Sequence, residues 1–300
     1  MRIFVTGGTG FIGKYVVRLL ARKGYSLLVL TRKPPSNWPQ LTESVAYLQG
    51  NLQTPSTFAA AMVDFKPKIL IHLAWEGLPD YSLKMCKKNF DYSIDIYSLA
   101  MEAGCSCVIT AGSCWEYSER IGKLSEDSSL ETFNLFSAVK NAIRFFGEAI
   151  AGNNNCLFYW LRIFFTYGPG QRSTSLVPHI IESIKHNRSL QINSPENKID
   201  FIFVEDVAQA ILKIIENEPQ NSIYNVGTGN AICVKEVVKI IHEIMNKVFN
   251  EKMFINRNIS NPIQDFRADI TQIQKDIGWH HRYDIRSGIE KTINNFVYQK

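Results

Sequence analysis

The stretch Val5-Thr6-Gly7-Gly8-Thr9-Gly10-Phe11-Ile12-Gly13 closes a short apolar strand and opens an amphipathic helix. In such a strand–loop–helix unit, one glycine permits a tight turn, a second lets a pyrophosphate approach the backbone, and a third lets the helix pack close to the sheet. The free N–H groups at the helix N-terminus then attract the pyrophosphate. We therefore expect Gly7, Gly10, Phe11, Ile12 and Gly13 to hold a dinucleotide. A glycine-rich turn without a ligand is the alternative interpretation.

Further apolar segments follow along the chain, and helical segments near 83–103 and 134–151 lie between them. Their apolar residues run continuously instead of alternating with polar ones, which is typical of a parallel sheet covered on both faces. The expected strands are 25–30, 45–48, 68–74, 107–111 and 157–165. The sequence thus predicts an α/β protein with a doubly wound parallel sheet of the Rossmann type, which binds its ligand at the carboxyl ends of the strands.

Beyond Tyr167 the pattern of apolar segments becomes shorter and more irregular. We expect residues 1–166 and 201–228 to form the dinucleotide-binding domain, with 201–215 returning to the main sheet. Residues 167–200 and 229–300 are then expected to form a smaller, discontinuous C-terminal lobe that binds the substrate.

The composition, 45% hydrophobic and 20% charged residues, is ordinary for a soluble enzyme. A strand that begins by Ile3 leaves no room for a signal peptide, and no apolar run approaches the length of a membrane span, so we expect a cytoplasmic protein without membrane contact. The six cysteines lack the paired spacing of a metal site, and we expect reduced thiols and no metal. The net charge of +5 is scattered over the chain, which argues against a nucleic-acid partner.

The segment 136–150 is apolar around much of its circumference when it is drawn as a helix. Such a helix is either buried completely within its own subunit or buried partly by a second subunit. A homodimer formed through this helix is therefore one of two open expectations.

The residues at the end of the second strand bear on the choice of cofactor. A carboxylate expected there would bind the ribose 2′-hydroxyl of NAD, but the chain has Thr31, Arg32 and Lys33. Two cations and a hydroxyl suit the 2′-phosphate of NADP. We therefore predict NADP(H) in preference to NAD(H). The alternative interpretation is that Arg32 and Lys33 are solvated surface cations without a role in cofactor binding.

A longer series of segments closely resembles the extended short-chain dehydrogenase/reductase family, which contains nucleotide-sugar epimerases, dehydratases and reductases. The resemblance covers nearly the whole chain, and it places Asn51 and Leu52 near the adenine and Leu73 and Ala74 under the cofactor. The matching segments, in chain order, are 6–13, 71–74, Asn89, 113–117, 162–170, 203–208, 224–229, Asp269 and 277–279.

The resemblance implies three catalytic groups: a serine, a tyrosine that exchanges a proton with the substrate, and a lysine four residues later that holds the nicotinamide ribose and lowers the pKa of the tyrosine. Ser113 and Lys140 match, but position 136 holds Phe. Three explanations stay open. Phe136 replaced tyrosine by design; another group (Ser113, Glu116, Ser137 or a water) is the acid; or the protein has lost redox catalysis and only binds its ligands.

Within the family, segments 111–117 and 159–171 are similar to the sugar-nucleotide 4-ketoreductases. This similarity implies an NADP(H)-dependent oxidoreductase that reduces a 4-keto-6-deoxyhexose carried on a nucleoside diphosphate. One alternative is a nucleotide-sugar epimerase or dehydratase that recycles a bound NAD. Another is a catalytically impaired dinucleotide-binding protein.

Four residues are expected to contact the nucleotide-sugar substrate. Trp115 and Glu116 follow Ser113, and Arg172 and Arg267 are candidates for bidentate contacts with the diphosphate. Packing and surface salt bridges are the alternative roles of these side chains. The family often has arginine where this chain has Ile199, which removes one expected phosphate contact.

Overall fold

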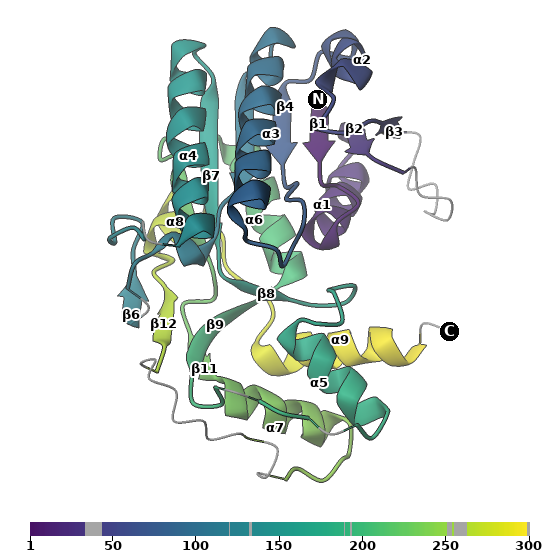
Figure 1. Ribbon diagram of the computed structural model, residues 1–300, viewed down its shortest axis with the longest axis vertical. Helices are drawn as coiled ribbons and strands as arrows, with labels where there is room; N and C mark the ends of the chain where they lie inside the picture. Colours follow the sequence, from purple (N-terminus) through teal and green to yellow (C-terminus); the bar gives the residue numbers. More distant parts are fainter. Residues whose placement is uncertain are drawn as a thin grey trace.

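The computed structural model describes residues 1–33, 44–119, 121–131, 134–188, 190–192, 194–250, 254 and 263–298. These residues form a larger α/β part, in the upper half of Figure 1, and a smaller part below it. In this view the strands of the larger part are seen between and to the right of α4 (Leu135–Asn153) and α3 (Leu83–Glu102).

The larger part contains a parallel sheet of seven strands among the described residues, in the order β10-β7-β5-β4-β1-β2-β3. The chain order reverses between β1 and β4, which is the arrangement of a doubly wound sheet. The prediction of a Rossmann-type α/β fold is therefore confirmed. The strands are β1 (Arg2–Thr6), β2 (Ser26–Thr31), β3 (Val45–Gln49), β4 (Ile69–His72), β5 (Cys107–Ala111), β7 (Leu157–Ile163) and β10 (Ile223–Val226).

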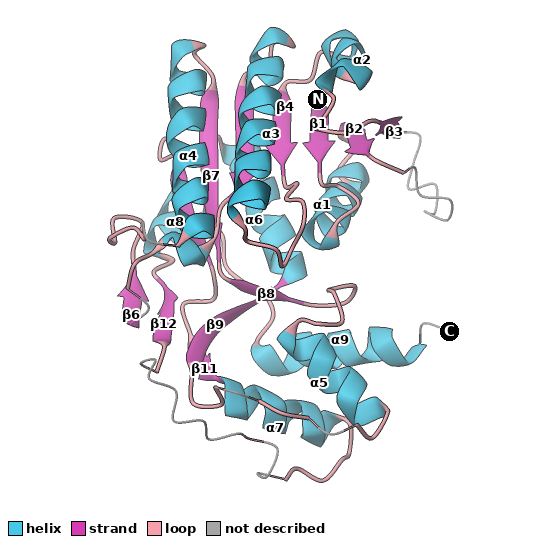
Figure 2. Ribbon diagram, in the orientation of Figure 1, coloured by secondary structure: helices cyan, strands magenta, loops and turns pink. Residues whose placement is uncertain are grey.

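Helices cover both faces of this sheet, which explains why its strands are continuously apolar (Figure 2). Ile3 and Val5 of β1 pack in one cluster with residues of α1 (Phe11–Arg22), α6 (Val204–Asn217) and α8 (Thr271–Ile277). Phe4, between them, packs in a cluster on the other face with residues of α2 (Ala59–Phe65), α3 and α4. Successive side chains of one strand thus enter two separate cores.

The smaller part contains a second sheet, β11-β9-β12-β6, with β8 paired to β9. Three helices pack in the same apolar cluster as these strands. The strands are β6 (Ile121–Leu124), β8 (Phe165–Tyr167), β9 (Lys198–Phe203), β11 (Ala231–Cys233) and β12 (Asp265–Ala268), and the helices are α5 (Leu176–Lys185), α7 (Val234–Ile244) and α9 (Ile285–Tyr298).

Two expectations about the strands are wrong. The segment 157–165 is not one strand, because it breaks at Phe164 into β7 of the large sheet and the start of β8 in the small one. The segment 201–215 does not return to the main sheet as a strand: β9 pairs in the smaller sheet, and Ile202 of β9 packs on the larger one together with the following α6. An apolar strand is equally compatible with either sheet, so local composition could not distinguish them. The division of the chain into two lobes stays a prediction.

A buried carboxylate connects distant segments of the smaller part. Asp200 of β9 has no exposed surface, and its carboxylate accepts hydrogen bonds from the backbone N–H groups of Thr228 (2.8 Å), Gly229 (2.9 Å) and Ala268 (3.1 Å). These bonds hold the turn after β10 against β12.

Among the described helices, none is long and apolar enough to cross a bilayer.

Candidate active site

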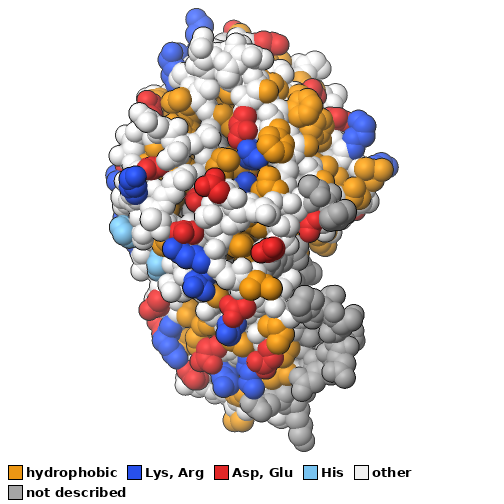
Figure 3. Space-filling view, turned by 90° about the vertical axis from the view of Figure 1, so that its left-hand side faces the viewer, with side chains coloured by type: hydrophobic (Ala, Val, Ile, Leu, Met, Phe, Trp, Pro, Cys, Tyr) orange, Lys and Arg blue, Asp and Glu red, His pale blue; other side chains and the backbone are white. Residues whose placement is uncertain are grey.

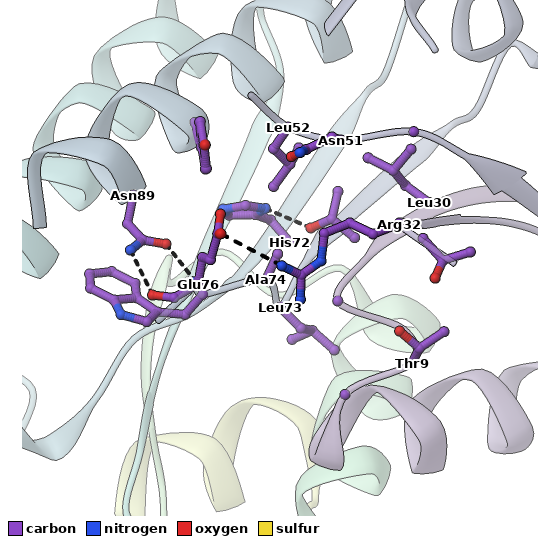
Figure 4. Close-up of a pocket in the computed structure, with 17 residues that line it drawn as sticks. Thr9, Leu30, Arg32, Asn51, Leu52, His72, Leu73, Ala74, Glu76 and Asn89 are labelled. Atoms are coloured by element: carbon purple, nitrogen blue, oxygen red, sulfur yellow. Dashed lines mark hydrogen bonds and ion pairs between the residues drawn. The ribbon is translucent and has the colours of Figure 1, made fainter. Parts of the chain in front are cut away.

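A cavity of about 200 Å³ opens at the carboxyl ends of β1, β2, β3 and β4 (Figure 4). This is the position predicted for the dinucleotide. Eight of the residues expected to contact the cofactor line it: Gly7, Gly10, Thr31, Arg32, Asn51, Leu52, Leu73 and Ala74.

The glycine loop has the geometry that its sequence predicts. Gly7, not Gly8, has the positive φ, of 71°, and a Cβ atom at position 7 would lie 2.6 Å from the backbone nitrogen of Ala74. At Gly13 a Cβ atom would lie 2.1 Å from the carbonyl oxygen of Gly7, so only glycine lets α1 approach the loop. Gly10 is the N-cap of α1 and provides no side-chain cap, which leaves the first N–H groups of the helix, those of Phe11 and Ile12, available to an anion.

The end of β2 bears no carboxylate. The hydroxyl of Thr31 donates a hydrogen bond to the carbonyl oxygen of Lys33 at 2.9 Å, and the side chain of Lys33 is exposed. Arg32, whose side chain is 68% exposed, reaches across the cavity and pairs with Glu76 at 3.6 Å (Figure 4). A cation therefore lies at the end of β2, and part of its charge is balanced by Glu76.

The segment after β4 contributes residues that the sequence reasoning did not single out, namely Trp75 and Glu76. The backbone of Glu76 is held in place by Asn89 of α3, which accepts from its N–H at 2.8 Å and donates to its carbonyl oxygen at 3.0 Å. The signal available in the sequence was their position directly after a buried strand, at the edge of the sheet where ligands bind.

His72 is buried beneath the cavity and contacts two hydroxyl groups, that of Thr6 at 2.7 Å and that of Ser93 at 3.1 Å. Burial, with a smaller contribution from the charge of Lys140, lowers the pKa of His72 to about 3. The imidazole therefore stays neutral near pH 7, and we assign it a structural role under the cofactor site.

Lys140 lies beside this cavity. Its Nζ donates a hydrogen bond to the carbonyl oxygen of Ala111 at 2.7 Å and lies 4.4 Å from the ring centroid of Trp75, one of the lining residues. Burial lowers the pKa of Lys140 to about 8, and the nearby charge of Glu116 opposes this shift.

Phe136 precedes Lys140 by one turn of α4, so the two side chains share a face. Its ring packs against those of Trp75 and Tyr81, with centroids 5.0 Å apart in both cases. Ser113 caps the short 3₁₀ helix η2 (Cys114–Glu116), where its Oγ accepts from the N–H of Trp115 at 3.2 Å.

The structure places Glu116 differently from its predicted role in substrate contact. Its side chain has no exposed surface, and its carboxylate accepts hydrogen bonds from the N–H of Ser113 (2.6 Å), the indole of Trp160 (2.8 Å) and the Nε of Arg162 (3.0 Å). Because the carboxylate is enclosed and fully engaged, Glu116 positions the Ser113 segment instead of facing a ligand. Only the tertiary structure brings Arg162 to it, from 46 residues away.

A second cavity lies in the smaller part, between η2, α5 and β9. Trp115, 37% exposed, lines it together with Phe165, whose ring centroid is 6.1 Å away. Arg172 and Arg267 line neither of the two cavities. The former is exposed and donates to the Oγ of Ser175 at 3.2 Å, and the latter lies half-buried in β12. Their predicted contacts with a diphosphate stay predictions.

Comparisons with known proteins agree with this geometry. A curated relative of this chain, dTDP-4-dehydro-6-deoxyglucose reductase of Escherichia coli, is 26% identical over 98% of this chain and 96% of its own length. Among solved structures, UDP-glucose 4-epimerase of Thermotoga maritima with UDP-glucose superimposes with a TM-score of 0.88, at 20% identity and 99% coverage of both chains. MoeE5 in complex with UDP-glucuronic acid and NAD has a TM-score of 0.86, at 24% identity and full coverage of both chains.

A sequence model described as the NAD dependent epimerase/dehydratase family matches residues 3–227, three quarters of the chain. This match includes the glycine loop, the Ser113 segment and Lys140. The chain therefore belongs to the NAD dependent epimerase/dehydratase family, and it is an enzyme of the extended short-chain dehydrogenase/reductase class.

Proposed function

We propose that this protein is an NADP(H)-dependent reductase of a 4-keto-6-deoxyhexose attached to a nucleoside diphosphate. The observation that carries the proposal is the groove at the ends of β1 to β4, which the glycine loop lines, with Lys140 packed on Trp75 at its edge. The relative named as dTDP-4-dehydro-6-deoxyglucose reductase, which aligns along almost the whole chain, supports the class of substrate.

The second cavity supports the same proposal, because a nucleotide sugar must extend away from the nicotinamide. Trp115 stands two residues after Ser113 in the chain and lines that cavity. A substrate whose sugar lies at Ser113 can therefore place its nucleotide between α5 and β9. Arg172 and Arg267 remain our candidates for its diphosphate.

The choice of NADP(H) depends on Arg32. No carboxylate stands at the end of β2 to repel a 2′-phosphate, and the guanidinium already reaches into the mouth of the cavity. MoeE5, by contrast, was solved with NAD. The alternative function is that of an epimerase or dehydratase, which would keep NAD bound and recycle it.

The proposal predicts consumption of NADPH, followed at its absorbance maximum, when nucleoside-diphosphate 4-keto-6-deoxyhexoses are supplied. We expect NADPH to bind more tightly than NADH, and Arg32→Ala to weaken NADPH binding about tenfold while changing NADH binding little, because one charged hydrogen bond at an exposed site is lost. Arg22→Ala, which removes an exposed cation from the end of α1, is the matched control.

Three results would decide against parts of this proposal. A preference for NADH contradicts the choice of cofactor. Purified protein that contains NAD and interconverts nucleotide sugars without net use of NADPH supports the rival epimerase or dehydratase. Thermal stabilisation by dinucleotide and nucleotide sugar without any turnover supports the impaired dinucleotide-binding protein.

We also propose that two copies of the chain associate through α4. Phe145 and Phe146 of this helix are each 53% exposed, and Phe146 packs edge-on against Phe90 of α3 at 5.3 Å. The side of the molecule shown in Figure 3 bears hydrophobic side chains in several groups over its upper half, among charged ones. Light scattering should give twice 34.2 kDa, and Phe146→Ser should shift the mass toward the monomer. A monomer at micromolar concentration contradicts the proposal.

The cytoplasmic location of the protein stays a prediction.

A further inference from the structure

A reductase of this kind needs a proton donor for the carbonyl oxygen, and Phe136 cannot be that donor. Several neighbouring groups are already engaged. The carboxylate of Glu116 is buried in three hydrogen bonds, and the hydroxyl of Ser137 donates to the carbonyl oxygen of Trp115 at 2.5 Å. His72 is neutral, buried and bonded on both ring nitrogens.

One phenol lies against Phe136. Tyr81 packs its ring on that of Phe136 at a centroid distance of 5.0 Å and an interplanar angle of 65°. The Tyr81 side chain is 44% exposed, and its hydroxyl makes no hydrogen bond within the described part of the chain. The Tyr81 side chain is therefore accessible to solvent.

The backbone around Tyr81 is held from both sides. Before it, the N–H of Asp80 donates to the carbonyl oxygen of Gly77 at 2.7 Å. After it, Ser82 caps α3 and its own N–H donates to the carboxylate of Asp80 at 2.8 Å. The carbonyl oxygen of Tyr81 itself accepts from the thiol of Cys86 at 3.5 Å. The phenol is thus presented by a turn that the start of α3 fixes.

We propose that Tyr81 is the catalytic acid of this enzyme and supplies the proton that a tyrosine at position 136 would otherwise supply. This inference rests on the proposed function. In the reduction, hydride from the reduced nicotinamide dinucleotide forms the new C–H bond at the carbonyl carbon, and the dinucleotide is oxidised. The carbonyl π electrons move to oxygen, which takes the proton of the Tyr81 hydroxyl. The resulting phenolate regains a proton from solvent through its exposed side.

Three variants test this assignment in steady-state assays with NADPH and the keto sugar. Tyr81→Phe keeps the ring contact with Phe136 and removes one oxygen, so we expect kcat to fall by about 10²–10⁴ while KM and the affinity for NADPH stay within about threefold. The double variant Tyr81→Phe with Phe136→Tyr should have a kcat at least tenfold higher than that of Tyr81→Phe alone. Tyr25→Phe, the same change at a half-buried tyrosine before β2, should leave kcat unchanged.

Each other outcome has a definite meaning. If Tyr81→Phe retains kcat within about threefold of the unmodified enzyme, Tyr81 is not the acid. If the unmodified enzyme is inactive and Phe136→Tyr alone creates activity, the assignment of Tyr81 is overturned while the proposed reductase chemistry stands. If neither the unmodified enzyme nor the Phe136→Tyr variant turns over any keto sugar, the proposed function fails, and the assignment of Tyr81 fails with it.

Discussion

Arg162→Met should lower the free energy of unfolding by about 3–5 kcal/mol, because it leaves the buried charge of Glu116 without its partner. The two side chains are 1% and 0% exposed, and the Nε of Arg162 donates to Glu116 at 3.0 Å. Arg162 also donates to the hydroxyl of Tyr117 at 3.0 Å and to the carbonyl oxygen of Glu126 at 2.6 Å. Methionine fills a similar volume but satisfies none of these acceptors.

Urea unfolding measures this effect as a shift of the midpoint at constant slope. Arg286→Met is the matched control, because Arg286 pairs with Glu243 where the side chains are 50% and 59% exposed. Such an exposed pair contributes about 0–1 kcal/mol. The double variant Glu116→Leu with Arg162→Met should regain part of the lost stability, since it removes both charges. A loss below about 1 kcal/mol in the single variant would contradict the structural role of this pair.

Lys140→Met should reduce kcat/KM by about ten- to a hundredfold, with weaker binding of the dinucleotide as one component. The reason is the loss of a charged hydrogen-bond donor worth about 1.5–3 kcal/mol at the edge of the cofactor groove. Nζ lies on Trp75 and bonds the carbonyl oxygen of Ala111, so its position is already fixed in the free protein. Lys213→Met, on the exposed side of α6, is the control.

The pH dependence gives a second test of Lys140. Its pKa is lowered to about 8, so the ammonium form dominates below pH 8 and the neutral amine above it. Binding of the anionic dinucleotide should therefore weaken as the pH rises through about 8. Lys140→Met should bind weakly throughout and lack this dependence. Equal pH profiles for the two proteins would show that Lys140 does not act on the cofactor through its charge.

The parts of the fold that the sequence predicted are those whose signals are local. The glycine loop, the continuous apolar strands and the intervening helices each fall within about twenty consecutive residues, and they correctly indicated a doubly wound sheet with a cavity at its carboxyl edge. The errors arose at apolar strands, because the local sequence pattern of such a strand is compatible with either of the two sheets. The strand β9 joined the smaller sheet, and the segment 157–165 divided between both sheets.

The amino-acid sequence by itself determined the Rossmann-type sheet and the glycine cradle, because period, spacing and side-chain type decide these features within short segments. The tertiary structure alone decided that Glu116 turns inward to Arg162 and that Tyr81 comes to lie on Phe136. The residues of these pairs are separated by 46 and 55 positions, and side chains so far apart meet only when whole strands and helices have packed. Burial and contact, which set the role of a polar side chain, are properties of that packing.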